Sequence, residues 1–276
     1  MFGERVSIGM DYSQYSCLSV TVSDRIATVA MHRPTNLNVA SVALVEELEQ
    51  FWRQVALDSE ILTIVLTGDG KVFSAGGDIK HMARRAGTPE GTQHSLRTPG
   101  GTRRLLQNML AVEQPIIAAV NGDAMGFGAN LALFCDITVM SQEARIGDTH
   151  VKIGLVAGDG GAVIWPLLIG INRAKDFLMR GRVASGAEAH SIGLVNYAVP
   201  ADQVSSEARK IALELAALPK WAVRWSKLSV NKHLQESFNL VLDTSIAYEM
   251  LTMQTNDFGE AARAFVEKRK PIFNGE

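Results

Sequence analysis

Two glycine-rich turns, each placed directly after an apolar strand-like run, constrain the fold of this chain more than any other feature. The first turn is FSAGGDIK (73–80), after the run 62–67, and the second is NGDAMGFGAN (121–130), after the run 116–120. Each turn leads into a predicted helix. The first backbone N–H groups of a helix have no acceptor within it, so two such turns can aim donors at one point. This arrangement predicts a site that stabilises a negatively charged oxygen, either an enolate or a tetrahedral intermediate.

Apolar periodicity predicts an α/β core around these turns. Strands are expected at 18–22 and 26–31, as a hairpin, and at 62–67, 116–120 and 137–140. Helical spacing is expected at 41–57, 105–112 and 129–134. Strands separated by helices favour an α/β layer built from repeated strand–strand–helix units. The polar segment 84–101, rich in Gly, Pro and Thr, is predicted to be a loop.

The pattern becomes mainly helical after Gly160. Short helices are expected at 165–169, 173–179 and 187–191, a strand at 194–199, and four helices at 204–218, 221–234, 238–254 and 258–269. The sequence therefore predicts two regions, a core with the oxyanion site over 1–199 and a helical C-terminal region over 200–276.

Composition and absent motifs exclude several classes of function. The net charge of −2 offers no general attraction to nucleic acid or to a membrane, so any anionic ligand needs a local cluster of cations. The N-terminus has no signal-peptide pattern, and Cys17 and Cys135 are expected to be buried reduced thiols, so a cytoplasmic location is predicted. No GxxxxGK[ST], GxSxG, HExxH or CxxC motif occurs, and no metal site is expected.

Taken together, the two turns resemble those of the enoyl-CoA hydratase/isomerase (crotonase) superfamily. The resemblance extends from MHRPTNLN at Met31 to FVEKRKPIF at Phe265. In that family an AGxD turn and a later GxxxGxG turn donate two oxyanion N–H groups, and the matching donors here are those of Gly77 and Phe127. The resemblance implies a ββα-spiral core, a helical C-terminal trimerisation region and a homotrimer or dimer of trimers. It also implies acyl-CoA thioester substrates, with coenzyme A as part of the substrate and no separate cofactor.

Two positions depart from the hydratase pattern. Family hydratases carry one glutamate on the helix after the second turn and another further along the chain, whereas this chain has Asn130 and His150 there. Asn130 can place a water or substrate by hydrogen bonds but cannot take up a proton. His150 can act as acid or base, since the ordinary pKa of histidine is about 6.5. A surface or capping histidine is the alternative.

Asp159 and Glu249 complete the candidate catalytic set. Asp159, in the turn AGDGG, could orient His150 and stabilise its charged form, or could cap the following helix. A histidine and an aspartate without a glutamate pair resemble the β-diketone hydrolase branch, typified by 6-oxocamphor hydrolase, in which water attacks a ketone and a C–C bond breaks. Glu249 would be the counterpart of a late-helix glutamate in that branch, or else a solvated or core-edge residue. Asp123 and Asp148 flank the site as possible acids or bases, or as turn caps.

Basic residues could hold the nucleotide part of coenzyme A. Lys80 follows the first turn, and Lys268 and Lys270 close the last helix. In the superfamily, basic residues at these places approach the phosphates, the C-terminal one often from a neighbouring subunit. The alternative for Lys268 and Lys270 is a solvated helix end that complements the helix dipole.

Three hypotheses remain from the sequence. The first is hydration, dehydration or isomerisation of an acyl-CoA thioester with His150 as acid/base, and the lysines favour it. The second is hydrolytic C–C cleavage of a β-diketone without coenzyme A. The third is a catalytically silent acyl-CoA-binding member of the superfamily.

Overall fold

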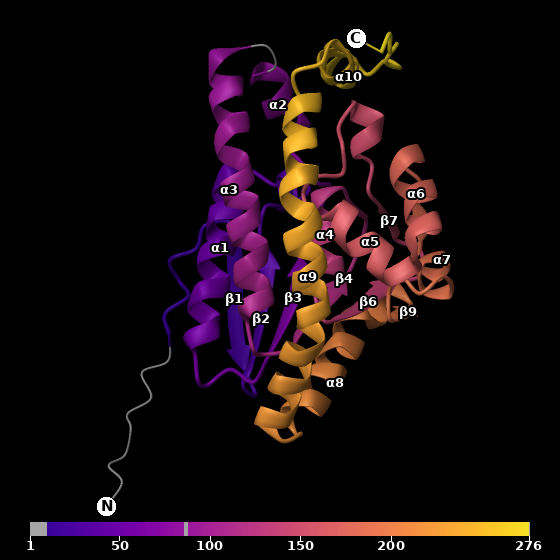
Figure 1. The fold of residues 1–276 in the computed structure, drawn as a ribbon. Coiled ribbons are helices and arrows are strands. Elements are labelled where there is room, and N and C mark those ends of the chain that lie inside the picture. The colour runs from indigo at the N-terminus through magenta and orange to yellow at the C-terminus, as the bar shows by residue number, and fades with distance from the viewer. Residues whose placement is uncertain (1–9, 86–87, 276) are drawn as a thin grey trace, which may run out of the picture.

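A large, mostly parallel sheet forms the centre of the fold (Figure 1). The computed structural model describes residues 10–85 and 88–275. The sheet has six strands in the order β1-β2-β3-β4-β6-β9. Their bounds are β1 Leu18–Ser23, β2 Ile26–Met31, β3 Thr63–Gly68, β4 Ile116–Val120, β6 Ile137–Ser141 and β9 Tyr197–Val199. β1 and β2 pair antiparallel, which confirms the predicted hairpin, and the other neighbours pair parallel.

A second layer of short strands turns this sheet into a ββα spiral. It contains β5 Ala124–Met125, β7 Arg145–Gly147 and β8 Ala184–Ser185. A bridge from Ser74 to Ala124 adds the first glycine turn to this layer. The chain thus passes repeatedly from a strand of the large sheet to the small layer and then into a helix, as the resemblance implied.

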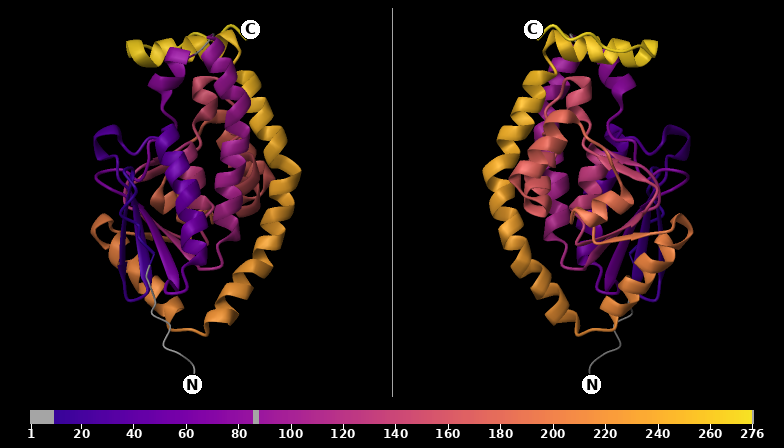
Figure 2. Two further views of the ribbon diagram at one scale, coloured as in Figure 1. Left: turned by 90° about the vertical axis from the view of Figure 1, so that its left-hand side faces the viewer. Right: turned by 90° about the vertical axis from the view of Figure 1, so that its right-hand side faces the viewer.

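Helices cover both faces of the large sheet (Figure 2). Alternate residues of β3 point to opposite faces, so Ile64 and Leu66 join the main core while Val65 packs against the helix after β9. The helices are α1 Val42–Leu57, α2 Ile79–Arg85, α3 Pro89–Ala111, α4 Phe127–Leu133, α5 Gly161–Ile169, α6 Ile171–Arg180, α7 Gly186–Ser191, α8 Val204–Ala216, α9 Lys220–Thr252 and α10 Asn256–Glu267. The described part of the chain also has three short 3-10 turns, η1 Pro34–Asn36, η2 His150–Ile153 and η3 Ala201–Gln203.

The helix α1 shows how the sequence specifies these elements. The Ser41 side chain accepts a hydrogen bond from the N–H of Leu44 (3.2 Å) and caps the helix. Leu44, Leu48, Phe51 and Val55 recur at helical spacing and are fully buried. Burial of each such side chain contributes roughly 1.5–3 kcal/mol relative to exposure, so this face holds α1 on the sheet.

The predicted loop at 84–101 is wrong, because most of it is helix. It contains the end of α2 and the first half of α3, while residues 86–87 lie outside the described part of the chain. Thr88 caps α3 by accepting from the N–H of Gly91 (3.0 Å), and Pro89 occupies a first-turn position that suits proline. The second half of α3 buries Leu105 and Met109 in the core. Tertiary packing therefore outweighs the poor helix propensity of the first half.

The C-terminal helices pack on the core and also differ from prediction. The helices expected at 221–234 and 238–254 form one continuous helix, α9, since no Gly or Pro interrupts 220–252. The predicted boundary between the two regions, after residue 199, falls between β9 and η3.

The Cys17 and Cys135 thiols are buried and form no disulfide bond, as expected. No helix in residues 10–85 and 88–275 is long and apolar enough to cross a membrane.

A buried ion pair joins α9 to the strand ends of the core. Lys227 Nζ lies 2.7 Å from Asp136 Oδ2 and also donates to the Gln114 carbonyl (2.9 Å). The same Asp136 oxygen accepts from the N–H of Ile116 at the start of β4 (2.7 Å). Burial raises the pKa of Asp136, and the Lys227 charge opposes that rise. The aspartate therefore depends on the lysine to remain ionised in the core.

We expect Lys227→Met to destabilise the fold, because it leaves Asp136 buried without its counter-charge. The free energy of unfolding should fall by about 3 kcal/mol at pH 7, measured by chemical denaturation. The double variant Lys227→Met/Asp136→Asn, which also removes the charge, should recover part of that loss. Equal stabilities of Lys227→Met and the unaltered protein would contradict this account of the junction.

Candidate functional site

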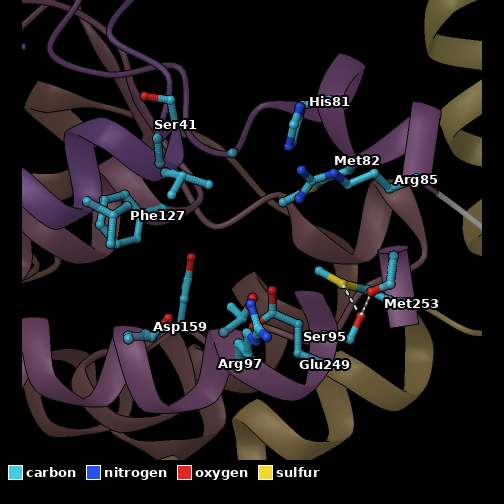
Figure 3. A pocket seen from close by; sticks show the side chains of 18 of the residues that line it. Ser41, His81, Met82, Arg85, Ser95, Arg97, Phe127, Asp159, Glu249 and Met253 are labelled. Atoms are coloured by element: carbon cyan, nitrogen blue, oxygen red, sulfur yellow. Dashed lines mark hydrogen bonds between the residues drawn. The ribbon is translucent and has the colours of Figure 1, made fainter. Parts of the chain in front are cut away.

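A pocket of about 530 Å³ opens between the two glycine turns and the helices α1, α3 and α9 (Figure 3). Its wall includes both predicted oxyanion donors and three of the predicted catalytic residues, namely Gly77, Phe127, His150, Asp159 and Glu249. Figure 3 shows the carboxylate of Asp159 pointing into the cavity. The fold therefore brings together residues that are widely separated in the sequence.

The backbone of the two glycine turns packs tightly at the pocket. The N–H of Met125 donates to the carbonyl of Ser74 (2.9 Å). A Cβ on Gly76 would lie 2.7 Å from the Met125 carbonyl oxygen, and one on Gly128 would lie 2.5 Å from the Ser74 Cβ. Only glycine permits both approaches. The contacts fix the two turns relative to each other.

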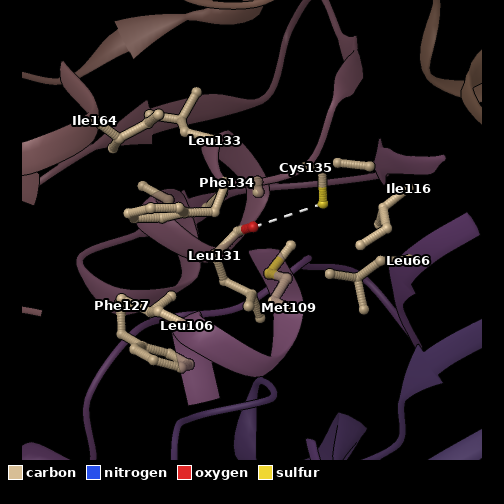
Figure 4. Packing of buried hydrophobic residues seen from close by; sticks show 14 of the residues in the cluster. Leu66, Leu106, Met109, Ile116, Phe127, Leu131, Leu133, Phe134, Cys135 and Ile164 are labelled. Carbon is tan, nitrogen blue, oxygen red and sulfur yellow. Dashed lines mark hydrogen bonds between the residues drawn. The ribbon is translucent and has the colours of Figure 1, made fainter. Parts of the chain in front are cut away.

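Each turn contributes an unpaired N–H group at the pocket wall. Within the described residues, the N–H groups of Gly77 and Phe127 donate to no acceptor. Phe127 is the first residue of α4, and its ring packs in the core near Leu106 and Leu131 (Figure 4), which anchors this end of the helix. Gly126 before it has φ +51°, in the left-handed region that favours glycine, and a Cβ there would lie 3.3 Å from the His150 ring.

A buried charge cluster lies beside these donors. His150 Nδ1 is 2.6 Å from Asp148 Oδ1, and its Nε2 is 3.3 Å from Asp159 Oδ2. Asn130 Nδ2 donates to Asp148 Oδ2 (2.9 Å) and to Asp159 Oδ1 (2.6 Å). Asn130 Oδ1 accepts from Trp165 Nε1 (2.9 Å). The imidazole and the amide thus link the same two carboxylates.

The cluster favours a charged histidine. Burial alone would lower the pKa of His150, but Asp148 and Asp159 outweigh it and raise this pKa well above its usual value. Burial raises the pKa of Asp148, yet the His150 charge and the hydrogen bonds from His150 and Asn130 lower it overall. At neutral pH the ring of His150 is an imidazolium between carboxylates, and both of its nitrogens already face partners.

Glu249, unlike His150, is uncharged near neutral pH. Its carboxyl group is buried at the pocket wall and makes no hydrogen bond to any described residue. Burial raises its pKa, the Asp159 charge raises it further, His150 lowers it and Asp148 raises it, giving a value of about 8. Glu249 is therefore a neutral acid near pH 7, and it faces the same pocket as Asp159. A carboxyl group kept neutral near pH 7 can act as a general acid, and a second carboxyl group in the same pocket can act as its partner.

The turn at 158–161 makes room for these side chains. A Cβ on Gly158 would lie 2.5 Å from Glu249 Oε2, and one on Gly161 would lie 2.3 Å from Asp148 Oδ2. Gly160 has φ +112° and forms the N-cap of α5 without a side-chain cap. Asp159 is thus not the helix cap that the sequence offered as an alternative. Its carboxylate contacts Asn130 and His150 instead.

Several predicted residues occupy places that the sequence did not indicate. Asn130 does not line the pocket, and all its amide groups are paired with protein, which differs from the predicted contact with water or substrate. Lys80, Lys268 and Lys270 are exposed and lie outside the pocket wall. Asp123 pairs with Arg145 (2.8 Å to its N–H) away from the pocket, consistent with the turn-cap alternative.

The sequence offered a different role for Asp148 and no role for Trp165. Asp148 does accept from the N–H of His150 (3.3 Å), as a turn cap would, but its main partner is the imidazole. The spacing of Asp148 and His150, two residues apart, was the sequence signal that could have indicated this contact. Trp165 was placed on a predicted helix with no role, because no sequence pattern indicates that its N–H meets Asn130.

The same cluster offers a possible set of metal ligands. Asp148, His150 and Asp159 each bring one ligand atom to within 4.8 Å of the others. Those atoms already pair with one another as carboxylates and imidazolium. The geometry is accounted for by ion pairing alone, and the expectation of no metal stays a prediction.

The comparisons with known proteins agree on the family. The model of the enoyl-CoA hydratase/isomerase family matches residues 21–276. A putative enoyl-CoA hydratase of Thermus thermophilus is 36% identical over 254 residues, which cover 90% of this chain and 97% of that protein. The crystal structure of an enoyl-CoA hydratase/isomerase from Mycobacterium paratuberculosis superposes with a TM-score of 0.85 at 30% identity, covering 91% of this chain and 99% of the other. The chain belongs to the enoyl-CoA hydratase/isomerase family and has the crotonase fold.

One structural neighbour is of the second predicted class. A β-diketone hydrolase from the cyanobacterium Anabaena, bound to (S)-3-oxocyclohexyl acetic acid, superposes with a TM-score of 0.81 at 25% identity, covering 88% of this chain and 96% of that protein. Family membership therefore does not by itself choose between the two reactions. A relative from Dictyostelium discoideum, 31% identical, is named as mitochondrial, so the cytoplasmic location stays a prediction.

We expect Glu249→Gln to change how stability depends on pH. The folded-state pKa of about 8 lies above the unfolded value of 4.5, so the stability associated with neutral Glu249 is fully present below pH 4.5 and is lost as pH rises to about 8. The free energy of unfolding of the variant, relative to the unaltered protein, should therefore rise across this window by on the order of 4 kcal/mol.

Chemical denaturation between pH 4.5 and pH 8 measures this difference. Glu236→Gln makes the same change at an exposed position of α9 and is the control. The raised pKa of His150 contributes in the same direction in both proteins. A difference between Glu249→Gln and the unaltered protein that does not vary with pH would disprove the raised pKa of Glu249.

Proposed function

We propose that this protein is an enzyme that acts on an acyl-CoA thioester, by hydration or dehydration or by moving a double bond, through an enolate intermediate. The observation that carries the proposal is the composition of one pocket wall. Among the described residues it combines two backbone N–H groups without an acceptor, on Gly77 and Phe127, with a neutral carboxyl group on Glu249 and the carboxyl group of Asp159, which points into the pocket.

The two N–H groups would form the oxyanion hole. A thioester oxygen gains negative charge as the enolate forms, and fixed donors in a site with little water stabilise that charge strongly. A single oxyanion donor is typically worth about 3 kcal/mol in the transition state. The packed glycine backbones support this role, since they hold both donors in place before substrate binds.

Glu249 and Asp159 would share the proton transfers. In hydration, Asp159 accepts a proton from water while the water oxygen bonds to the β carbon, and the double-bond electrons move onto the thioester oxygen. Glu249 then donates its proton to the α carbon as the carbonyl re-forms. A proton passed from Asp159 back to Glu249 restores the starting state. Dehydration is the same sequence in reverse.

His150 would act through Asp159 in this scheme. Both of its ring nitrogens face carboxylates, and its Nε2 lies 3.3 Å from Asp159 Oδ2, where its positive charge would hold that carboxylate in place. The sequence suggested that His150 itself takes up and donates the proton. We propose instead that His150 acts indirectly, through Asp159. Asn130 would support the same carboxylate by hydrogen bonding.

Lys80 and Lys268 remain candidates for binding the phosphates of coenzyme A. Both are exposed, and Lys268 ends α10 with φ +55°. In the proposed homotrimer or dimer of trimers, Lys268 would reach the site of a neighbouring subunit. Coenzyme A would enter as part of the substrate, with no separate cofactor.

The second candidate is hydrolysis of a β-diketone. The His150–Asp159 contact, the buried Glu249 and the Anabaena neighbour favour it. In that reaction water adds to one ketone, the C–C bond to the intervening carbon breaks, and that carbon takes up a proton to leave a ketone and a carboxylic acid. The oxyanion donors would stabilise the enolate that departs. A third candidate, a silent acyl-CoA-binding member, shares the pocket but predicts no turnover.

Loss of either carboxyl group should remove catalysis with little effect on binding. We expect Glu249→Gln and Asp159→Asn each to lower kcat on crotonyl-CoA by about 10²–10⁴-fold, with KM changed much less. Parallel assays with crotonyl-CoA and with a bicyclic β-diketone show which substrate is used. The control variant Glu236→Gln, on the same helix but exposed, should behave like the unaltered protein.

The outcomes separate the candidates. Turnover of the diketone and not of crotonyl-CoA would favour the hydrolase, while tight acyl-CoA binding without turnover on a broad panel would favour the silent member. Full activity of both carboxyl variants would eliminate the proposed acid–base pair.

The rate should also fall at alkaline pH. Glu249 acts in its neutral form, and its pKa is about 8, so kcat/KM should decline as pH rises through that value. The pH profile of kcat/KM measures this limb. The residual activity of Glu249→Gln should lack it, and a rate that stays level to pH 9.5 would contradict the assignment of Glu249 as acid.

A further inference from the structure

Trp165 occupies a place in the charge cluster that the proposed reaction does not yet use. It lies on α5 with a fully buried side chain, and its ring packs against Phe177 with the centroids 5.4 Å apart. Its indole Nε1 donates to Asn130 Oδ1 (2.9 Å). Among the described residues no other donor reaches that oxygen.

The chemistry of the two side chains makes this contact directional. An asparagine amide has a donor end and an acceptor end of nearly the same shape, so it can turn by about 180° in a pocket. An indole N–H can only donate, so it selects the carbonyl end of Asn130. The NH₂ end must then face Asp148 and Asp159, as observed. The opposite orientation would set an amide oxygen against two carboxylates with no proton between them.

We infer that Trp165 is a positioning residue for the reaction: its indole N–H fixes the orientation of the Asn130 amide, and through that amide it holds the Asp159 carboxylate in place at the pocket. This inference rests on the proposed function, in which Asp159 accepts the proton. Trp165 does not line the pocket, so its effect reaches the substrate only through Asn130 and Asp159.

Several charged or titratable groups surround Asp159. His150 of η2 and Asp148 before it face the carboxylate, Glu249 faces it from α9, and Arg97 of α3 lines the same pocket. Trp165→Phe alters none of these groups. A change in kcat would therefore report the loss of one neutral hydrogen bond.

The main test compares Trp165→Phe with Trp52→Phe. Trp52 is equally buried, but its Nε1 has no hydrogen-bond partner among the described residues, so its variant controls for the lost ring volume. We expect Trp165→Phe to lower kcat by about tenfold or more, with a smaller change in KM. Trp52→Phe should leave both kcat and KM unchanged.

A double-mutant cycle tests whether Trp165 acts through Asn130. In an Asn130→Leu background, adding Trp165→Phe should cause no further loss, since the amide it orients is gone. Equal losses from Trp165→Phe in both backgrounds would overturn the inference, and so would an unchanged kcat.

A readout without substrate separates this inference from the proposed function. The ring ¹⁵N signals of His150, identified by their absence in His150→Gln, should shift at neutral pH in Trp165→Phe and not in Trp52→Phe. If no form turned over crotonyl-CoA, the proposed function would fail while these spectra still decided the role of Trp165. Should Trp165→Phe not fold, the indole N–H of Trp165 in the unaltered protein must exchange slowly with solvent. Fast exchange would refute the contact.

Discussion

The hydrogen bonds of the Asn130 amide determine what the rest of the site can do. Its NH₂ group bridges Asp148 and Asp159, and the His150 imidazolium contacts the same two carboxylates. Buried charges are tolerated only when they are paired and hydrogen-bonded, and this network meets that condition. Glu249, which lies beside the network without a hydrogen bond to a described residue, therefore stays neutral. The neutral Glu249 thus lies beside carboxylates that the Asn130 amide and the His150 imidazolium hold in place.

The backbone packing of the glycine turns supplies the second half of the site. Gly76 and Gly128 allow the two turns to touch, and Gly158 and Gly161 allow the turn after His150 to lie against Glu249 and Asp148. Glycine thus serves here to bring backbones and charged side chains within a space that a Cβ would fill. The result is a site fixed before substrate binds, which is what oxyanion stabilisation requires.

The sequence predicted most strands and helices and the two donor turns, because period and glycine placement are local signals. It failed at 84–101, where the buried second half of α3 extends a helix through a segment of poor propensity. It identified His150, Asp159 and Glu249 as candidates through resemblance, but it could not give the raised pKa values of His150 and Glu249. Those pKa values depend on burial and on the charge of Asp148. The positions of these groups depend on contacts between segments that the sequence does not place side by side, such as that of Trp165 with Asn130.

In the proposed reaction, the Gly77 and Phe127 N–H groups hold the oxygen of a thioester between Glu249 and Asp159. A crystal structure with a non-hydrolysable acyl-CoA analogue would test this arrangement. We expect the carbonyl oxygen within about 3 Å of both backbone nitrogens, with the two carboxyl groups flanking the α and β carbons. A thioester bound with its oxygen away from both N–H groups, or with neither carboxyl group near those carbons, would contradict it.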